Sequence, residues 1–261
     1  MTDTLDDQNA KSFLHDLKFD LRPTVQEGPG RGMTGTLDVT PEMLVAGSDR
    51  VQLGVLATVA DVAMGTPISD VVGKPVIGLT VDLVVRCLRP LGPGTYGIDA
   101  RVLKRGRTIS VAETTFLDGA DVVGHSIATF MPVEIDGPLA MPMPEKGPRI
   151  GEGDLDTSFV DALGVVVERP GVAMVDRRPY TLQPAGTIQG GVVCTLVEVA
   201  AQSLLGGPIA DLDVRFLAQV KHGPGRAEAE RLDDRSARVI VTDAGSGDPR
   251  ATAYAIARLG P

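Results

Sequence analysis

The sequence contains very few aromatic residues. Its 261 residues include 6 Phe, 3 Tyr and no Trp. Val, Ala and Leu must therefore fill the core, and stacked aromatic platforms for nucleic acid bases are scarce. The net charge of -9 also disfavours a surface for nucleic acids or anionic membranes. We expect neither as a partner.

Cysteine, histidine and long apolar runs are also scarce. The two cysteines, Cys87 and Cys194, lie in apolar stretches and are expected to be reduced and buried. None of the histidines lies at metal-ligand spacing from another ligand type, so no metal site is predicted. The acidic start of the chain is not typical of a signal peptide, and no apolar run is long enough to span a bilayer. These features predict a cytoplasmic protein.

Two common catalytic motifs are missing. No Gly-x-Ser-x-Gly elbow occurs, which disfavours an α/β-hydrolase. No Gly-x-Gly-x-x-Gly follows a strand and opens a helix, so a nucleotide cofactor is not indicated. We expect no cofactor.

What the sequence does contain is an internal repeat. "GVLATVADVAMG" (Gly54–Gly65) aligns without a gap with "GVVCTLVEVAAQ" (Gly191–Gln202). Further along, "DLVVRCL" (Asp82–Leu88) matches "DLDVRFL" (Asp211–Leu217), and a Gly-Pro-Gly turn follows each. Three matches in the same order indicate a duplication.

A segment rich in proline and glycine separates the two copies. Five prolines and four glycines lie between Pro132 and Leu155. This composition excludes a regular helix or a central strand. We therefore predict one half at 1–135, a linker at 136–155 and a second half at 156–261.

Each half has the pattern of short strands, one long helix and then several strands. No second helix alternates with the strands, which favours an antiparallel sheet wrapped on one helix. In 211–221, Leu212, Val214, Phe216, Ala218 and Val220 alternate with mostly polar residues, which predicts a strand over the whole segment. Other predicted strands are 18–25, 33–39, 82–88, 107–116, 124–133, 236–244 and 251–259.

The two predicted helices carry one acid each, Asp61 and Glu198. Each helix is apolar nearly all round and should be buried nearly all round. A carboxylate there needs either a partner or a function. For Asp61, the structural alternative is an ion pair with Arg86 or Arg89.

The stretches "QLGVLATVAD" and "QGGVVCTLVE" resemble the motif of the hotdog-fold thioesterases, in particular the PaaI-like acyl-CoA thioesterases. That motif is His-Gly-Gly, followed by an apolar helix with an acid eight positions after the first glycine. The resemblance covers most of both halves. It implies an α+β fold of two fused hotdog domains, each a long central helix wrapped by a curved antiparallel β-sheet. It also implies an acyl-CoA thioesterase, with coenzyme A as part of the substrate, and leaves open a homodimer of such chains.

In this family the acid of one helix faces the Gly-Gly start of the helix in the other hotdog. The resemblance thus implies a first site in which Asp61 faces Gly190 and Gly191, whose amides would hold the thioester oxygen. Gln183 stands where related enzymes place an Asn or Gln that orients the attack. Gln189 replaces the motif histidine as a substrate contact. We predict that this is the working site.

The second implied site combines Glu198 with Gln52 and Gly54. Here Leu53 replaces the first glycine, and Ala46 stands at the position of Gln183. We expect this site to be degenerate or altered. The alternative for Glu198 is a relic of the duplication that keeps a polar contact between the halves.

The clearest basic cluster consists of Lys104, Arg105 and Arg107. Related proteins place such groups near the coenzyme A phosphates, so these residues are candidate substrate contacts. A solvated hairpin is the alternative. Their less clustered counterparts in the second half are Arg215, Lys221 and Arg226.

Thioester hydrolysis needs a carboxylate that activates water or attacks directly, and an oxyanion hole. Asp61 fits either role. Two other functions remain open: a non-catalytic acyl or acyl-CoA binding protein, favoured by the missing motif histidine, and a hotdog enoyl-CoA hydratase or dehydratase. The last uses an Asp/His pair, and none of His15, His125 and His222 lies in either motif.

Overall fold

The computed structural model describes residues 12–24, 32–69, 76–134, 149–151, 153 and 155–260. The acidic start of the chain and most of the predicted linker lie outside these residues. Of the linker, Arg149–Gly151 forms the short strand β7, which pairs with β1 at an edge of the sheet.

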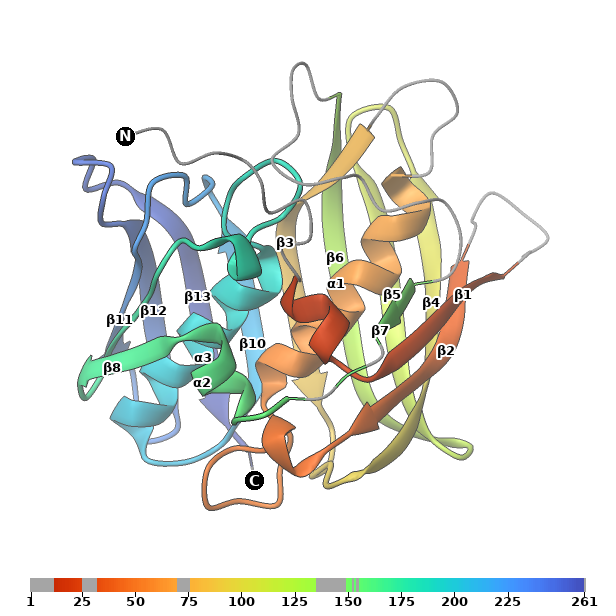
Figure 1. Cartoon of the computed structure of the whole chain (residues 1–261), viewed down its shortest axis with the longest axis horizontal. Coiled ribbons are helices and arrows are strands. Elements are labelled where there is room, and N and C mark those ends of the chain that lie inside the picture. Colours follow the sequence, from red (N-terminus) through yellow and green to blue (C-terminus); the bar gives the residue numbers. More distant parts are fainter. Residues whose placement is uncertain are drawn as a thin grey trace.

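One antiparallel sheet carries the described fold (Figure 1). Its first-half strands are β1 (Phe19–Thr24), β2 (Gly32–Val39), β3 (Val76–Cys87), β4 (Gly94–Arg105), β5 (Ser110–Asp118) and β6 (Asp121–Glu134). Its second-half strands are β8 (Val165–Arg169), β9 (Val172–Val175), β10 (Ile209–Phe216), β11 (Gly225–Arg231), β12 (Ser236–Asp243) and β13 (Ala251–Leu259). The strand order is β7-β1-β2-β4-β5-β6-β3-β10-β13-β12-β11-β9-β8.

This strand order is mirrored about its centre, where β3 pairs antiparallel with β10. On either side of that pair, β6 corresponds to β13, β5 to β12 and β4 to β11. Each half also has one long helix between its early strands and its central strand, α1 (Leu53–Ser69) and α3 (Gly190–Leu205). The repeat in the sequence is therefore a repeat of the same elements in the same order.

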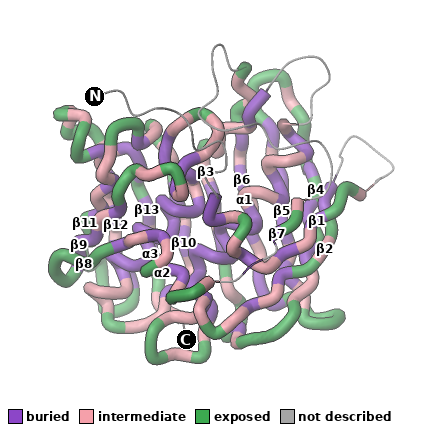
Figure 2. Tube along the Cα trace, viewed as in Figure 1, coloured by how far each residue is buried: buried purple, intermediate pink, exposed green. Residues whose placement is uncertain are grey.

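Both long helices lie against one face of the sheet (Figure 1), and burial is concentrated along them and the strands behind (Figure 2). The reason is their composition, because a helix with almost no polar side chain can be stable only when it is covered. α3 ends at Gly206, whose φ of 82° is the left-handed conformation of a glycine cap. The short helices are η1 (Phe13–Asp16), η2 (Pro41–Met43), α2 (Phe159–Leu163) and η3 (Pro179–Thr181).

The two helices cross very closely near their first turns. A Cβ atom on Gly54 would collide with Thr195 of α3, and one on Gly191 would collide with Thr58 of α1. Asp61 and Glu198 each lie three residues after one of these threonines. The crossing therefore brings each acid to the start of the opposite helix.

One strand prediction is wrong in its length. The alternation over 211–221 predicts a single strand, but β10 ends at Phe216. The amides of both Leu217 and Ala218 donate to the carbonyl of Thr252, which interrupts the regular ladder. The chain then forms a loop in which the Val220 carbonyl accepts from the amide of Ile188.

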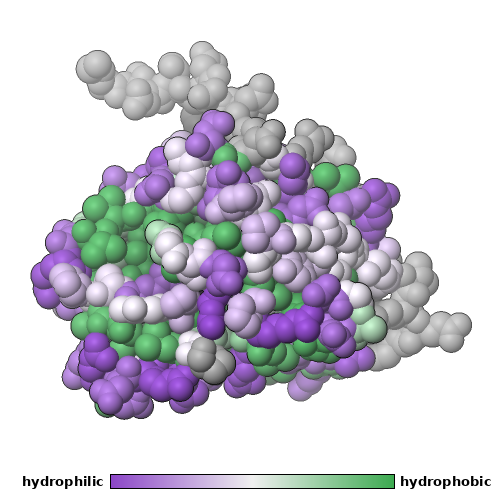
Figure 3. Space-filling model, turned by 90° about the horizontal axis from the view of Figure 1, so that it is seen from below, coloured by the Kyte–Doolittle hydropathy of each residue, from purple (hydrophilic) through white to green (hydrophobic). Residues whose placement is uncertain are grey.

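Seen from below, the surface shows apolar patches separated by hydrophilic side chains (Figure 3). Scattered patches of this kind are ordinary on a folded domain and do not by themselves indicate a docking face. No helix in the described part of the chain is long and apolar enough to cross a membrane.

Candidate active site

Asp61 is held by two neutral side chains. Its Oδ1 accepts a hydrogen bond of 2.6 Å from the Thr80 hydroxyl, and its Oδ2 accepts one of 3.2 Å from Nε2 of Gln189. Thr80 lies on β3, and Gln189 immediately precedes α3. The carboxylate therefore joins elements of both halves.

The alternative of an ion pair for Asp61 is wrong. Arg86 pairs with Asp211 at 3.6 Å, and Arg89 pairs with Asp118 at 2.7 Å. No cation among the described residues pairs with Asp61. Burial raises its pKa to about 6, while the Thr80 hydrogen bond lowers it. At neutral pH the group is then an unusually basic carboxylate.

At the start of α3, one part of the predicted oxyanion hole, the Gly191 amide, is wrong. Oε1 of Gln189 accepts from the amides of Gly191 at 2.6 Å and Val192 at 3.2 Å, so it caps the helix. The Gly191 amide is thus already occupied. Position 191 is a glycine because Thr58 lies too close to leave room for a side chain. Gln189, predicted as a substrate contact, instead bridges the helix start and Asp61.

Gly190 retains the features expected of an oxyanion donor. Its amide donates to no other described residue. A Cβ on Gly190 would lie 3.5 Å from Oδ2 of Asp61, so the glycine leaves space directly beside the carboxylate. The amide also belongs to the positive end of the α3 dipole.

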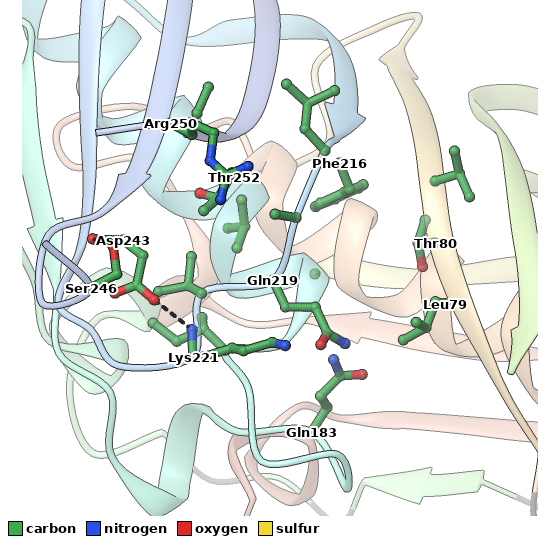
Figure 4. A pocket seen from close by; sticks show the side chains of 18 of the residues that line it. Leu79, Thr80, Gln183, Phe216, Gln219, Lys221, Asp243, Ser246, Arg250 and Thr252 are labelled. Carbon is green, nitrogen blue, oxygen red and sulfur yellow. Dashed lines mark hydrogen bonds between the residues drawn. The ribbon is translucent and has the colours of Figure 1, made fainter. Parts of the chain in front are cut away.

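Asp61 and Gly190 open on a cavity of about 750 Å³ (Figure 4). Its wall comes from β3, from the end of β10 with the following loop, and from the segment between β12 and β13. Its apolar lining residues include Leu79, Val193 and Phe216. The other lining residues are Gly78, Thr80, Val81, Met131, Gln183, Ile188, Leu217, Ala218, Gln219, Val220, Lys221, His222, Asp243, Ser246, Asp248, Arg250, Ala251 and Thr252.

Gln183, predicted to orient the attack, is one of these lining residues. Its Nε2 donates to the Thr187 hydroxyl at 2.6 Å, and its backbone amide donates to the Thr187 carbonyl. These two bonds hold the side chain on the cavity wall. The structure therefore places Gln183 in the same cavity as Asp61 and Gly190.

Glu198 has a different environment, although it occupies the equivalent position in the repeat. Its Oε1 and Oε2 accept hydrogen bonds of 2.7 Å from the amides of Leu53 and Gly54, and the residue is fully buried. Gln202 donates to Oε1 at 2.9 Å, and Gln52 donates to the same oxygen in the amide orientation that satisfies both groups. Burial raises the pKa of Glu198 to about 8, and the two amides lower it. Glu198 thus caps α1 from the opposite helix.

The basic cluster lies away from the cavity. Lys104, Arg105 and Arg107 are exposed, and none of them lines it. Arg105 donates to the Pro67 carbonyl at 2.6 Å, near the end of α1. In the sheet, Arg105 is three strands from Thr80, or roughly 14 Å. A role for the cluster in phosphate binding stays a prediction.

Two contributions to the site were missed in the sequence. Thr80 has no motif around it, and its role becomes visible only when β3 lies beside α1. The loop after β10 was interpreted as strand. Among the described residues, no group of three or more His, Cys, Asp and Glu side chains could hold a metal ion.

No protein-family model matches the chain, and no curated protein matches it. Solved structures do resemble it. An acyl-ACP thioesterase from Bacteroides thetaiotaomicron superimposes with a TM-score of 0.59 at 12% identity, over 86% of this chain and 96% of that one. The 12:0-ACP thioesterase from Umbellularia californica gives 0.57 at 9% identity, over 90% and 98%.

A third similar structure carries the name of the fold. It is a conserved protein with a hot dog fold from Alicyclobacillus acidocaldarius, with a TM-score of 0.52 and 16% identity over 96% of this chain and 99% of that one. At such identities the similarity concerns the fold alone. Together with the antiparallel sheet and the helices on its face, it shows that this chain has a hotdog fold.

Proposed function

We propose that the protein is an acyl-CoA thioesterase that hydrolyses its substrate in the Asp61 cavity. One observation carries the proposal: a carboxylate with a pKa raised to about 6 opens on a cavity beside the unpartnered Gly190 amide at a helix start. Two of the similar structures are thioesterases that act on acyl-ACP, which supports the same type of reaction here.

The proposal includes two fused hotdog domains, at 1–135 and 156–261, joined by the segment 136–155. The mirrored strand order and the repeated helix support this division. Asp61 belongs to the first domain, and Gln183, Gln189 and Gly190 belong to the second. The working site would then lie between the domains and need both.

In the proposed reaction, Asp61 removes a proton from water while the water oxygen attacks the thioester carbonyl carbon. The Gly190 amide and the α3 dipole stabilise the negative charge that develops on the carbonyl oxygen. The tetrahedral intermediate then collapses, the C–S bond breaks, and the proton passes from Asp61 to the leaving thiolate. The products are a carboxylic acid and a free thiol.

Direct attack by Asp61 on the carbonyl carbon is the other form of this mechanism. Thr80 and Gln189 hold one carboxylate oxygen each, and each oxygen retains a further lone pair. A single turnover in ¹⁸O-labelled water separates the two forms. General base catalysis puts the label into the first product acid. Attack by Asp61 breaks the C–S bond, releases the thiolate and leaves a mixed anhydride, which water then hydrolyses at the Asp61 carboxyl carbon. The label then enters Asp61, and the first product acid keeps an unlabelled Asp61 oxygen.

The test of the function is a hydrolysis screen over acyl-CoA chain lengths with the wild type and Asp61→Asn. We expect turnover in the wild type and a loss of about 100-fold or more in the variant, which is the usual contribution of a general base. Asp99→Asn, on an exposed position of β4, is the matched control and should behave like the wild type.

A non-catalytic acyl-CoA binding protein is the second candidate. The capping of Gly191 and Val192 by Gln189 favours it, because it leaves one amide rather than two for an oxyanion. Binding of acyl-CoA without turnover at any chain length would select this candidate.

A further inference from the structure

The loop between β10 and β11 places a lysine in the cavity wall. The Lys221 side chain has no hydrogen bond or ion pair within the described part of the chain. The other basic groups of the wall are paired: Arg250 with Asp248 at 2.6 Å, and Nδ1 of His222 with Asp243 at 3.3 Å. Lys221 therefore contributes a positive charge that no described side chain neutralises directly.

Asp243 holds the backbone of this loop in place. Its Oδ2 accepts from the amides of Lys221 at 2.8 Å and His222 at 2.9 Å, and its Oδ1 accepts from the amide of Gly223 at 2.8 Å. Burial raises the pKa of Asp243, but these bonds together outweigh that effect, so the pKa lies below its ordinary value. The backbone of Lys221, an exposed residue, is thus held in place before any ligand arrives.

Two carboxamides lie near the lysine. Figure 4 shows the ends of Gln183, Gln219 and Lys221 gathered on one side of the cavity. The Gln219 amide, like the Lys221 ammonium, has no partner among the described side chains. An ammonium and a carboxamide with free N–H donors are suited to a carboxylate or a phosphate, since charge-assisted hydrogen bonds are the strong ones.

We propose that Lys221 and Gln219 form an anion subsite, so that the substrate is a thioester carrying a negatively charged group. This inference rests on the proposed function for the position of the thioester beside Asp61. The ionised Asp61 in the same cavity would repel such a substrate, and Lys221 offsets that repulsion. The charge has two possible sources: a carboxylate on the acyl chain, or the phosphate of a phosphopantetheine arm.

Calorimetric binding to Asp61→Asn protein tests the subsite without turnover. The probes are hexanoyl-pantetheine, which is neutral, adipoyl-pantetheine, which adds an acyl carboxylate, and hexanoyl-4′-phosphopantetheine, which adds a phosphate. We expect an anionic probe to bind at least about tenfold more tightly than the neutral one. A gain for adipoyl-pantetheine identifies the acyl carboxylate, and a gain for the phosphorylated probe identifies the arm.

The gain must depend on the lysine. In Asp61→Asn protein, the additional substitution Lys221→Met should remove the gain in affinity for the anionic probe. Lys221→Arg should retain most of that gain. Arg169→Met, exposed on the edge strand β8, is the matched control and should leave it unchanged. Equal affinities for all probes, or a gain that survives Lys221→Met, would overturn the subsite. Absence of hydrolysis in the wild type would overturn the proposed function instead, and the binding result would still stand.

Discussion

Asp61 and Glu198 occupy equivalent positions in the repeat, yet their surroundings differ. Glu198 accepts hydrogen bonds from the first two amides of α1, whereas Asp61 accepts from side chains only, those of Thr80 and Gln189. The extra methylene of glutamate lets its carboxylate reach the opposite helix start. The shorter aspartate accepts from no amide of α3, two of whose first amides donate to Gln189, and it lines the cavity.

The preceding glutamines differ in the same way. Gln189 caps its own helix at Gly191 and Val192, while Gln52 contributes to the environment of Glu198. In one half the glutamine caps the helix and the acid stays available. In the other half the acid itself caps the helix. The duplicated motif thus supports a candidate active site on one side and a structural contact on the other.

Glu198→Ala should give the largest effect on stability. It leaves the buried amides of Leu53 and Gly54 without acceptors, so we expect the free energy of unfolding to fall by about 3 kcal/mol. Chemical denaturation followed by circular dichroism measures the loss. Glu198→Gln, which retains one acceptor oxygen, should lose less. Unchanged stability together with abolished hydrolysis would show that Glu198 is catalytic.

Asp61→Glu should make the first site resemble the second. The longer side chain can reach the start of α3 and compete with Gln189 for its amides. We expect kcat/KM to fall by about 100-fold, or about 2.7 kcal/mol, with little change in stability. Kinetics and thermal denaturation together check this. Full activity in Asp61→Glu would show that side-chain length does not explain the difference between the Asp61 and Glu198 sites.

The pH dependence should report the Asp61 carboxylate. Because its pKa is raised to about 6, kcat/KM should increase with pH up to about 6 and then level off. The raised pKa also means that the folded state binds the proton more tightly than the unfolded state. The contribution of Asp61 to stability is therefore present below the unfolded pKa and lost as the pH rises through 6. Unfolding curves should show Asp61→Asn gaining stability relative to the wild type over this range.

Gln189→Ala should have a smaller effect on stability than Glu198→Ala. It removes the cap of α3, for which a loss of about 1 kcal/mol is typical. A thermal melt beside Gln52→Ala compares the two glutamines directly. Gln52 is proposed to act through Glu198, so Gln52→Ala should cost less stability in a Glu198→Ala background than in the wild type. The opposite result would contradict the proposed division of roles between the two glutamines.

Much of the fold was predictable, because hydrophobic periodicity and the repeat report local structure. Both long helices and many of the strands were predicted from apolar patterning and internal alignment, but β4, β8, β9 and β11 were not. The segment 211–221 was predicted with the wrong length, since alternation continues through a loop whose first amides bond to Thr252. The periodicity of a sequence does not show where the neighbouring strand stops offering regular hydrogen-bond partners.

By itself, the sequence determined that two similar units exist, that each buries one acid in an apolar helix, and that the two copies differ at Leu53 and Gly190. Only the tertiary structure decided which groups each acid contacts. The crossing of α1 and α3 at Thr58 and Thr195 sets which amides a side chain can reach, and the acid of the second copy is one methylene longer than that of the first. Hydrogen bonds act over about 3 Å, and no pattern along the chain resolves distances of that size between residues more than a hundred positions apart.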